Sequence, residues 1–200
     1  MSEGTWRADE ASGLLFRTIA AHRATVVSLG TYSRQRRLSG PLEDREQIQC
    51  QATLVRLLSI AESFSGERLL EELQRIVDRS SHKAINEIWE RTAVSATNTW
   101  DEQKKAYKEL LGVTLSNADW TSVGKLAEAR NAVAHGLGAL TRRQLRNRQG
   151  TVDKLRSCGI TLVNGRIVLS DQVLFDAART CREFIRKLDF AIENRGPDYR

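Results

Sequence analysis

The stretch SDQVLFDAARTCREFIRKLDFAI, residues 170–192, decides the fold class. Its apolar residues recur every three or four positions, which is the period of an amphipathic α-helix. They are Leu174, Ala177, Ala178, Cys181, Phe184, Ile185, Leu188 and Ile192. Ser170 and Asp171 stand just before this pattern and are typical N-capping residues. The sequence therefore predicts a long closing helix whose apolar face packs against other helices.

A β-hairpin is predicted immediately before that helix. Residues 160–169 read ITLVNGRIVL, in which two β-prone runs flank Asn164-Gly165. This dipeptide is the strongest short hairpin signal, because both residues tolerate the positive φ angles of a two-residue turn.

Helical patterns dominate the middle of the chain. Thr99–Glu102 and Thr141–Gln144 both have the form of a capping box. The first predicts a helix that ends at Leu111, with Gly112 after it. The second predicts a short basic helix. Between them, Asn117 or Asp119 is expected to cap a helix that Gly136 and Gly138 end.

The N-terminal half also shows helical spacing, interrupted by glycines. We expect a helix over residues 14–29 that Gly30 stops, a loop over 31–40, and a helix that starts at Pro41 and ends near Gly66. A third helix is expected over 69–77. Ser80 or Ser81 is expected to cap a fourth helix, which carries Ile85, Ile88, Trp89 and Val94.

These patterns predict an all-α fold, a helical bundle with one small hairpin before the C-terminal helix. The 200 residues fit one ordinary domain. We divide them into an N-terminal helical extension over 1–40, the main domain over 41–194, and a frayed tail over 195–200. The first ten residues lack the apolar core of a signal peptide, and no apolar run reaches the length of a membrane span. The sequence predicts a cytoplasmic protein.

Basic residues are concentrated in one part of the chain. The net charge is +6, and residues 121–166 hold nine basic and two acidic residues, so the remainder is nearly neutral. Such a distribution favours a polyanionic partner, RNA or another nucleic acid. Solvated surface arginines without a partner are the alternative.

Most catalytic motifs are absent. The chain has no HExxH, no P-loop, no GxGxxG and no GxSxG. Cys50, Cys158 and Cys181 are scattered and odd in number, which fits neither a disulfide framework nor a zinc site and suggests a reducing compartment. The sequence thus predicts no metal and no cofactor.

The remaining candidate is Ala129-Arg130-Asn131-Ala132-Val133-Ala134-His135-Gly136. Asn131 and His135 are four residues apart and share a helix face. Gly136 implies that the helix ends just after His135, where the helix dipole stabilises a protonated imidazole. Arg130 offers a planar fork for a phosphate. Arginine and histidine without metal ligands suffice for transesterification of RNA, because the 2′-hydroxyl is the nucleophile. An ordinary helix end is the alternative.

The stretch over residues 126–136 resembles the motif of the HEPN superfamily, in which an arginine and a polar residue precede a histidine. The chain is similar to the RiboL-PSP type of HEPN domain over roughly residues 45–190. Leu58-Ser59-Ile60-Ala61-Glu62-Ser63-Phe64 is similar to that type's acidic-Ser-Phe stretch, and Trp120 stands shortly before the motif helix.

The resemblance implies a dimeric, metal-independent endoribonuclease that functions in toxin–antitoxin or anti-phage defence. It implies catalytic roles for Arg130 and His135 and a supporting role for Asn131. Glu62 is expected to point into the same cleft and pair with Arg130 or His135; a solvated glutamate is the alternative. A cognate antitoxin is an expected partner.

Two further expectations concern RNA binding and assembly. Arg142, Arg143, Arg146 and Arg148 are expected to track the RNA backbone. Residues five apart lie roughly 140° apart on an ideal helix, so we expect Arg130 and His135 to act in a composite dimer site. The alanines at 127, 129, 132 and 134 are expected to permit close helix approach at that interface. The rival hypothesis is a non-catalytic module that binds RNA or a protein.

The other aromatic and histidine residues are assigned structural roles. His22 falls on an apolar stripe and is expected in the core, and His82 is expected at an exposed helix start. All four tryptophans are expected in the core or at an interface: Trp6, Trp89, Trp100 and Trp120.

Overall fold

The computed structural model describes residues 5–36, 42–77, 89 and 92–195 of the chain. Within these residues the fold is all-α, apart from one two-stranded antiparallel sheet. The fold class predicted from the sequence is confirmed. No helix in the described ranges is long and apolar enough to cross a membrane.

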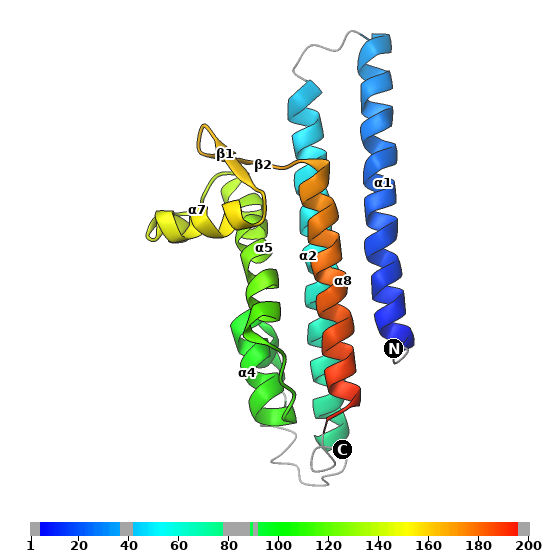
Figure 1. The fold of residues 1–200 in the computed structure, drawn as a ribbon, viewed down its shortest axis with the longest axis vertical. Coiled ribbons are helices and arrows are strands. Elements are labelled where there is room, and N and C mark those ends of the chain that lie inside the picture. The colour runs from blue at the N-terminus through cyan, green and yellow to red at the C-terminus, as the bar shows by residue number, and fades with distance from the viewer. Residues whose placement is uncertain (1–4, 37–41, 78–88, 90–91, 196–200) are drawn as a thin grey trace.

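Three long helices stand side by side: α1 (Trp6–Arg36), α2 (Leu42–Val77) and α8 (Asp171–Glu193) (Figure 1). α1 runs antiparallel to α2 and α8. Leucines form much of their shared core. On α2, for example, Leu54, Leu57 and Leu58 are completely buried. The apolar stripe predicted for α8 is buried as expected, from Leu174 to Ile192.

The predicted helix breaks at Gly30 and Gly66 are wrong, because α1 continues to Arg36 and α2 continues to Val77. A glycine inside a helix costs only about 1 kcal/mol relative to alanine, which tertiary packing readily offsets. Gly66 is buried, and a Cβ at this position would meet Thr97 and Gln103 at 3.8 and 4.0 Å. Gly66 therefore lies in a buried part of α2 in ordinary contact with its neighbours, where it was expected to mark a helix end.

A second layer consists of α4 (Trp100–Leu111) and α5 (Asn117–Gly136), which lie on the other side of α2 (Figure 1). The predicted start and end of α4 are confirmed. Thr99 caps its first turn by accepting a hydrogen bond from the Glu102 amide, and Gly112 follows with φ 63°. The buried Tyr107 hydroxyl donates to the Ser65 carbonyl at 2.6 Å and thereby ties α4 to α2.

The end of α5 is held by a small subdomain of α6 (Arg142–Leu145), α7 (Arg148–Ser157), β1 (Thr161–Val163) and β2 (Arg166–Val168). The Thr141 capping box and the hairpin are both present as predicted, and Asn164 and Gly165 have φ angles of 50° and 76°. The Ile167 amide donates to the Gly138 carbonyl at 2.8 Å. The hairpin therefore fixes the segment that follows α5.

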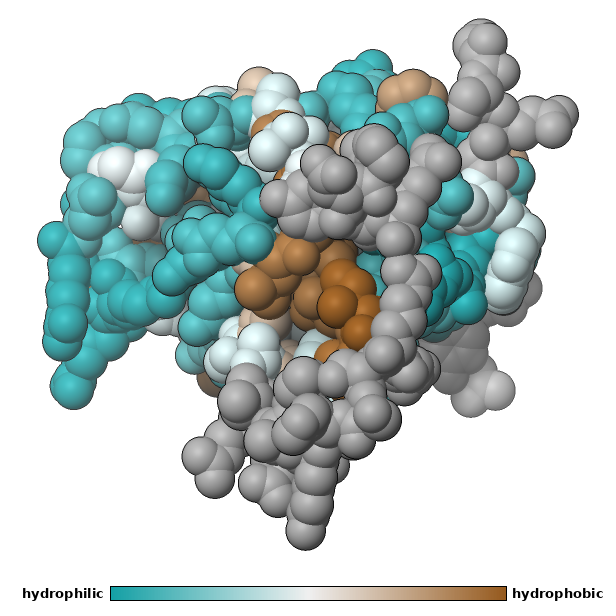
Figure 2. All heavy atoms as spheres, turned by 90° about the horizontal axis from the view of Figure 1, so that it is seen from below, coloured by the Kyte–Doolittle hydropathy of each residue, from teal (hydrophilic) through white to brown (hydrophobic). Residues whose placement is uncertain are grey.

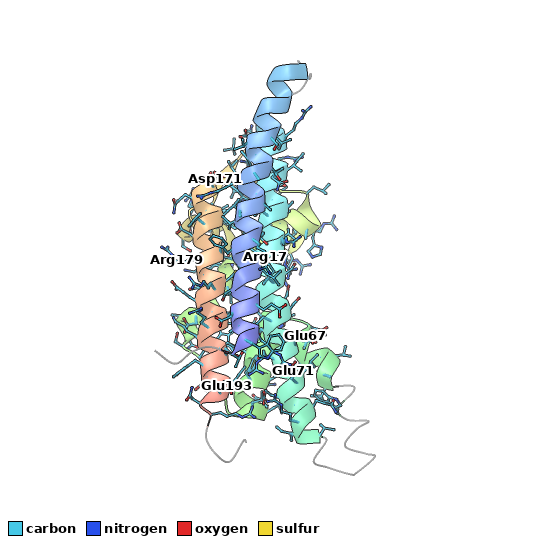
Figure 3. All side chains as sticks on the ribbon, turned by 90° about the vertical axis from the view of Figure 1, so that its right-hand side faces the viewer. Arg17, Glu67, Glu71, Asp171, Arg179 and Glu193 are labelled. Atoms are coloured by element: carbon cyan, nitrogen blue, oxygen red, sulfur yellow. The ribbon has the colours of Figure 1, made fainter. Side chains whose placement is uncertain are left out.

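Charged side chains lock the opposite end of the bundle. Arg68 is almost fully buried and donates to Glu193 of α8 at 2.7 Å, with Asp189 at 3.6 Å. Asp189 also accepts a hydrogen bond from the Thr5 amide at 2.7 Å. Figure 3 shows Glu67, Glu71 and Glu193 gathered at this end. Seen from the same end, the described surface is mostly hydrophilic around one central apolar patch (Figure 2).

Some predictions fall outside the described residues. These are the capping serines at 80 and 81, Ile85, Ile88, His82 and the tail after Arg195. Residues 92–97 are helical, and Val94 in this segment is exposed, although it was expected on an apolar face.

Candidate functional site

α5 carries the candidate motif, and its two ends are set by local interactions. Ser116 is the N-cap, in place of the predicted Asn117 or Asp119, because its hydroxyl accepts a hydrogen bond from the Asp119 amide. The helix ends at Gly136, just after His135, as predicted. The residue that adopts the left-handed conformation is Leu137, with φ 52°, and the following Gly138 amide donates back to the Ala132 carbonyl. This cap leaves His135 exposed in the last turn.

Arg130 is held by Glu62, which extends from α2. Arg130 Nη2 lies 2.8 Å from Glu62 Oε1 and 2.7 Å from Oε2, so one nitrogen donates to both carboxylate oxygens. The side chains are 21% and 28% exposed, which places the pair at the edge of the core. The predicted pairing of Glu62 with Arg130 is therefore present.

The hydrogen bonds to Glu62 leave part of the guanidinium free. A guanidinium has five N–H donors, two of them on Nη2. Arg130 Nε is buried and has no hydrogen-bond partner among the described residues. The two donors on Nη1 thus remain for a bound anion.

A pocket of about 830 Å³ lies over this pair. Four predicted site residues line it together: Glu62, Arg130, Asn131 and His135. Within the part of the chain that the structure describes, the side chains of Asn131 and His135 make no hydrogen bond to each other. Arg130 and His135 therefore border one pocket of a single chain, although they lie five residues apart.

Five basic and three acidic side chains line the pocket. Of the arginines predicted to track RNA, only Arg143 lines it, whereas Arg142, Arg146 and Arg148 are exposed outside it. The sequence did not indicate Lys104, because this lysine lies outside the basic stretch. Lys125 and Lys154 lie within that stretch and complete the basic lining.

Arg143 owes its place to the buried Gln144. The Gln144 side chain donates to the Glu128 carbonyl and to its carboxylate, both at 2.8 Å, and so fastens α6 to α5. Glu128 also lies 3.7 Å from Lys154 of α7. These contacts hold the basic rim against the motif helix.

One wall of the pocket is aromatic. Trp100 and Trp120 both line it, and both contact Phe184 edge-on, with ring centroids 5.4 and 5.0 Å away. Trp120 is buried, so the half-buried Trp100 is the ring that the pocket exposes. Trp6 is 69% exposed, which contradicts its expected place in the core and leaves an interface as its remaining predicted role.

The alanines of α5 do not form an outer surface. Ala127, Ala129 and Ala132 are buried within the chain's own core, and only Ala134 of the predicted set is exposed. Their small size allows α5 to approach its neighbours in the same chain. The expectation that they face a second copy is therefore wrong.

A second cluster was missed by the sequence interpretation. His22 is buried as predicted, but its ligand atoms lie within 4.8 Å of those of Cys50 and Asp171. It is the one such group of metal-binding residue types among the described residues. The three residues come from α1, α2 and α8, so no sequence spacing indicates the cluster.

No protein-family model matches the chain, and no curated protein or solved structure has significant similarity to it.

Proposed function

We propose that the protein is a metal-independent endoribonuclease of the HEPN type, which cleaves RNA by attack of the 2′-hydroxyl on the adjacent phosphate. One observation carries the proposal: a single pocket gathers His135, the Glu62–Arg130 pair and a basic rim. The reaction needs positive charge on the phosphate and a group that transfers protons, and these residues supply both.

Each residue has a role in this proposal. Arg130 binds the scissile phosphate through Nη1, while Glu62 fixes the guanidinium plane through Nη2. His135 accepts the proton of the 2′-hydroxyl or donates one to the leaving 5′-oxygen. Asn131, one helical turn before His135, orients the imidazole when RNA is bound. The products carry a 2′,3′-cyclic phosphate and a 5′-hydroxyl.

The basic rim places the RNA, and the exposed edge of Trp100 offers a surface for a base. Arg143, Lys104 and Lys125 contact phosphates beside the scissile one. Arg142, Arg146 and Arg148 lie farther out and contact the RNA that leaves the pocket. Lysine and arginine contacts of this kind bind the backbone without reading the sequence.

The experiment is a cleavage assay with purified protein in excess EDTA. Wild-type protein should cut RNA, and His135→Ala should lose the activity while its helical circular dichroism is unchanged, because His135 is exposed. Arg179→Ala is the matched control, since Arg179 is exposed on α8 and does not line the pocket (Figure 3). A substrate with a 2′-deoxy sugar at the scissile position should resist cleavage. A requirement for Mg²⁺ would contradict the mechanism.

We further propose a twofold dimer in which two pockets face one groove. Transesterification needs both a base for the 2′-hydroxyl and an acid for the 5′-oxygen, and each chain offers one histidine in its pocket. Leu137 is 81% exposed beside His135, and Leu145 is also exposed, which gives this face apolar area for self-association. Heterodimers of wild-type and His135→Ala protein would hold one such histidine, so an excess of the variant should inhibit the wild-type protein. A fully active monomer by light scattering would refute the dimer model.

The second candidate is a non-catalytic module that binds RNA or a protein through the same pocket. It is favoured by one observation: His135 has no described partner that orients its ring. This module would bind RNA and leave it intact in the assay above. In either case we propose a cytoplasmic protein of a toxin–antitoxin or anti-phage system, with an antitoxin as a cognate partner.

A further inference from the structure

Three helices bring His22, Cys50 and Asp171 together, away from the pocket described above. His22 and Cys50 are 2% and 4% exposed, whereas the Asp171 side chain is 62% exposed. Figure 3 shows Asp171 at the first turn of α8, beside α1. Gln47 of α2 fixes this arrangement, because its side chain bonds both the Leu169 carbonyl at 2.7 Å and the Leu169 amide at 2.9 Å. The start of α8 is thereby held against α2, one turn from Cys50.

The hydrogen bonds of Thr53 are compatible with the tautomer of His22 that binds a metal ion through Nε2. The Thr53 hydroxyl donates its one hydrogen to the Gln49 carbonyl at 2.8 Å. Its oxygen lies 3.0 Å from His22 Nδ1 and therefore accepts from that nitrogen. In this tautomer Nδ1 carries the proton, and Nε2 of a neutral imidazole presents its lone pair.

That lone pair faces a carboxylate. His22 Nε2 lies 3.1 Å from Asp171 Oδ1, and in this tautomer the two acceptors need a cation between them. The cation is either a proton on Nε2 or a metal ion. A proton would leave the nearby Cys50 sulfur unused, whereas a metal ion would bind all three groups.

We propose that His22 Nε2, Cys50 Sγ and Asp171 form a binding site for Zn²⁺ or a similar borderline-soft divalent cation, with a fourth position open to solvent beside Asp171. Zinc binds nitrogen, sulfur and carboxylate oxygen at about 2.0–2.3 Å in a tetrahedron, so its ligand atoms lie roughly 3.3–3.8 Å apart. The Nε2–Oδ1 separation is already near that range, and the sulfur lies within 4.8 Å of a ring nitrogen of His22 and a carboxylate oxygen of Asp171. Thr53 supplies the outer hydrogen bond that ligating histidines usually have.

The surrounding charge suits a cation. Burial, together with the negative charges of Asp171 and Glu46, raises the pKa of the Cys50 thiol to about 11. The same negative field attracts a metal ion. Since the thiol, and Nε2 where it carries a proton, must release protons to bind, zinc affinity increases with pH and protons are released on binding.

Metal binding would join α1, α2 and α8 at the end of the bundle opposite the Arg68 charges. A ligand that binds only the folded state raises its stability by mass action. For a protein of this size, Zn²⁺ at a hundred times its dissociation constant should raise Tm by about 5–10 °C. The site is therefore structural in effect, although its open position also leaves room for a substrate group.

The test is titration of the full-length, reduced protein with Co²⁺, which reports sulfur ligation through a thiolate-to-cobalt charge-transfer band. We expect the band in wild-type protein and in Cys158→Ser, which is the matched cysteine control. The band should be absent in Cys50→Ser. In Asp171→Asn, the affinity for Co²⁺ should fall by about tenfold or more. Asp171→Asn keeps the shape of an exposed side chain, so it remains informative if Cys50→Ser fails to fold.

Two results would overturn the proposal: no charge-transfer band at millimolar Co²⁺, or a band that persists in Cys50→Ser. Calorimetry with Zn²⁺ in two buffers of different ionisation enthalpy should show that protons are released on binding. An unchanged Tm with Zn²⁺ would also count against the site. The outcome is independent of the ribonuclease proposal, because Cys50, His22 and Asp171 do not line the pocket.

Discussion

The substitution Arg130→Lys separates the charge of this residue from its planar fork. In the structure, Nη2 holds Glu62 and Nη1 remains for a phosphate. A lysine ammonium is a single point donor and cannot serve both groups in this geometry. Losing one preorganised donor to a developing charge lowers kcat by about 10²–10³. We therefore expect Arg130→Lys to lose nearly as much activity as Arg130→Ala, in kcat at saturating RNA, with a small change in KM.

The same substitution should cost little stability. One of the two bonds to a half-buried carboxylate is lost, which is worth about 1 kcal/mol and lowers Tm by about 2–4 °C. Arg143→Lys is the matched control, since Arg143 lines the same pocket but makes no bond to Glu62 and should keep wild-type kcat. Single-turnover cleavage and thermal unfolding measure the two effects. Near wild-type kcat in Arg130→Lys would refute the role of the planar guanidinium in bonding Glu62 and phosphate together, and would leave only a role for its positive charge.

Two further predictions concern charge. Neutralising Arg142, Arg143 and Arg146 together should flatten the slope of log affinity against log salt by about 2, because each phosphate contact on single strands contributes about 0.7; an unchanged slope would mean that these arginines contact only water. The Lys187–Asp119 ion pair, at 2.5 Å, should show a coupling of about 0.2–1 kcal/mol in a double-mutant cycle of urea unfolding at pH 7. Burial would raise the pKa of Asp119, but hydrogen bonds, led by that from Lys187, hold it below 3.8. Because this folded-state pKa is lowered, the coupling is complete above about pH 5 and should vanish as the pH falls through the lowered value.

Local signals in the sequence were sufficient where neighbours along the chain decide the structure. The capping residues Thr99, Thr141 and Ser170 and the Asn164-Gly165 turn act within four residues, and all were placed correctly. The contents of the pocket were partly predictable, because Arg130, Asn131 and His135 share one helix. Glu62 was expected from a resemblance and not from any spacing.

What was missed depends on contacts between distant segments. Gly30 and Gly66 do not end their helices, because packing against neighbouring elements outweighs their weak intrinsic propensity. Lys104 reaches the pocket from α4, which the charge of the linear sequence does not reveal. His22 and Asp171 meet only because α8 folds back beside α1.

The continuity of α2 through Gly66 has a consequence for amide hydrogen exchange. A helix of 36 residues extends about 54 Å, so one rod carries Cys50, Glu62 and the Arg68 charges. Buried side chains lie on both sides of the glycine, and no loop divides the helix into segments that open separately. Amides on either side of Gly66 should therefore exchange together, at the slow rate of global unfolding. The hairpin has strands of only three residues, and beyond their mutual pairing the backbone of β2 bonds, among the described residues, only the short segment at Gly138 and Ala139, so its amides should exchange earlier by local opening.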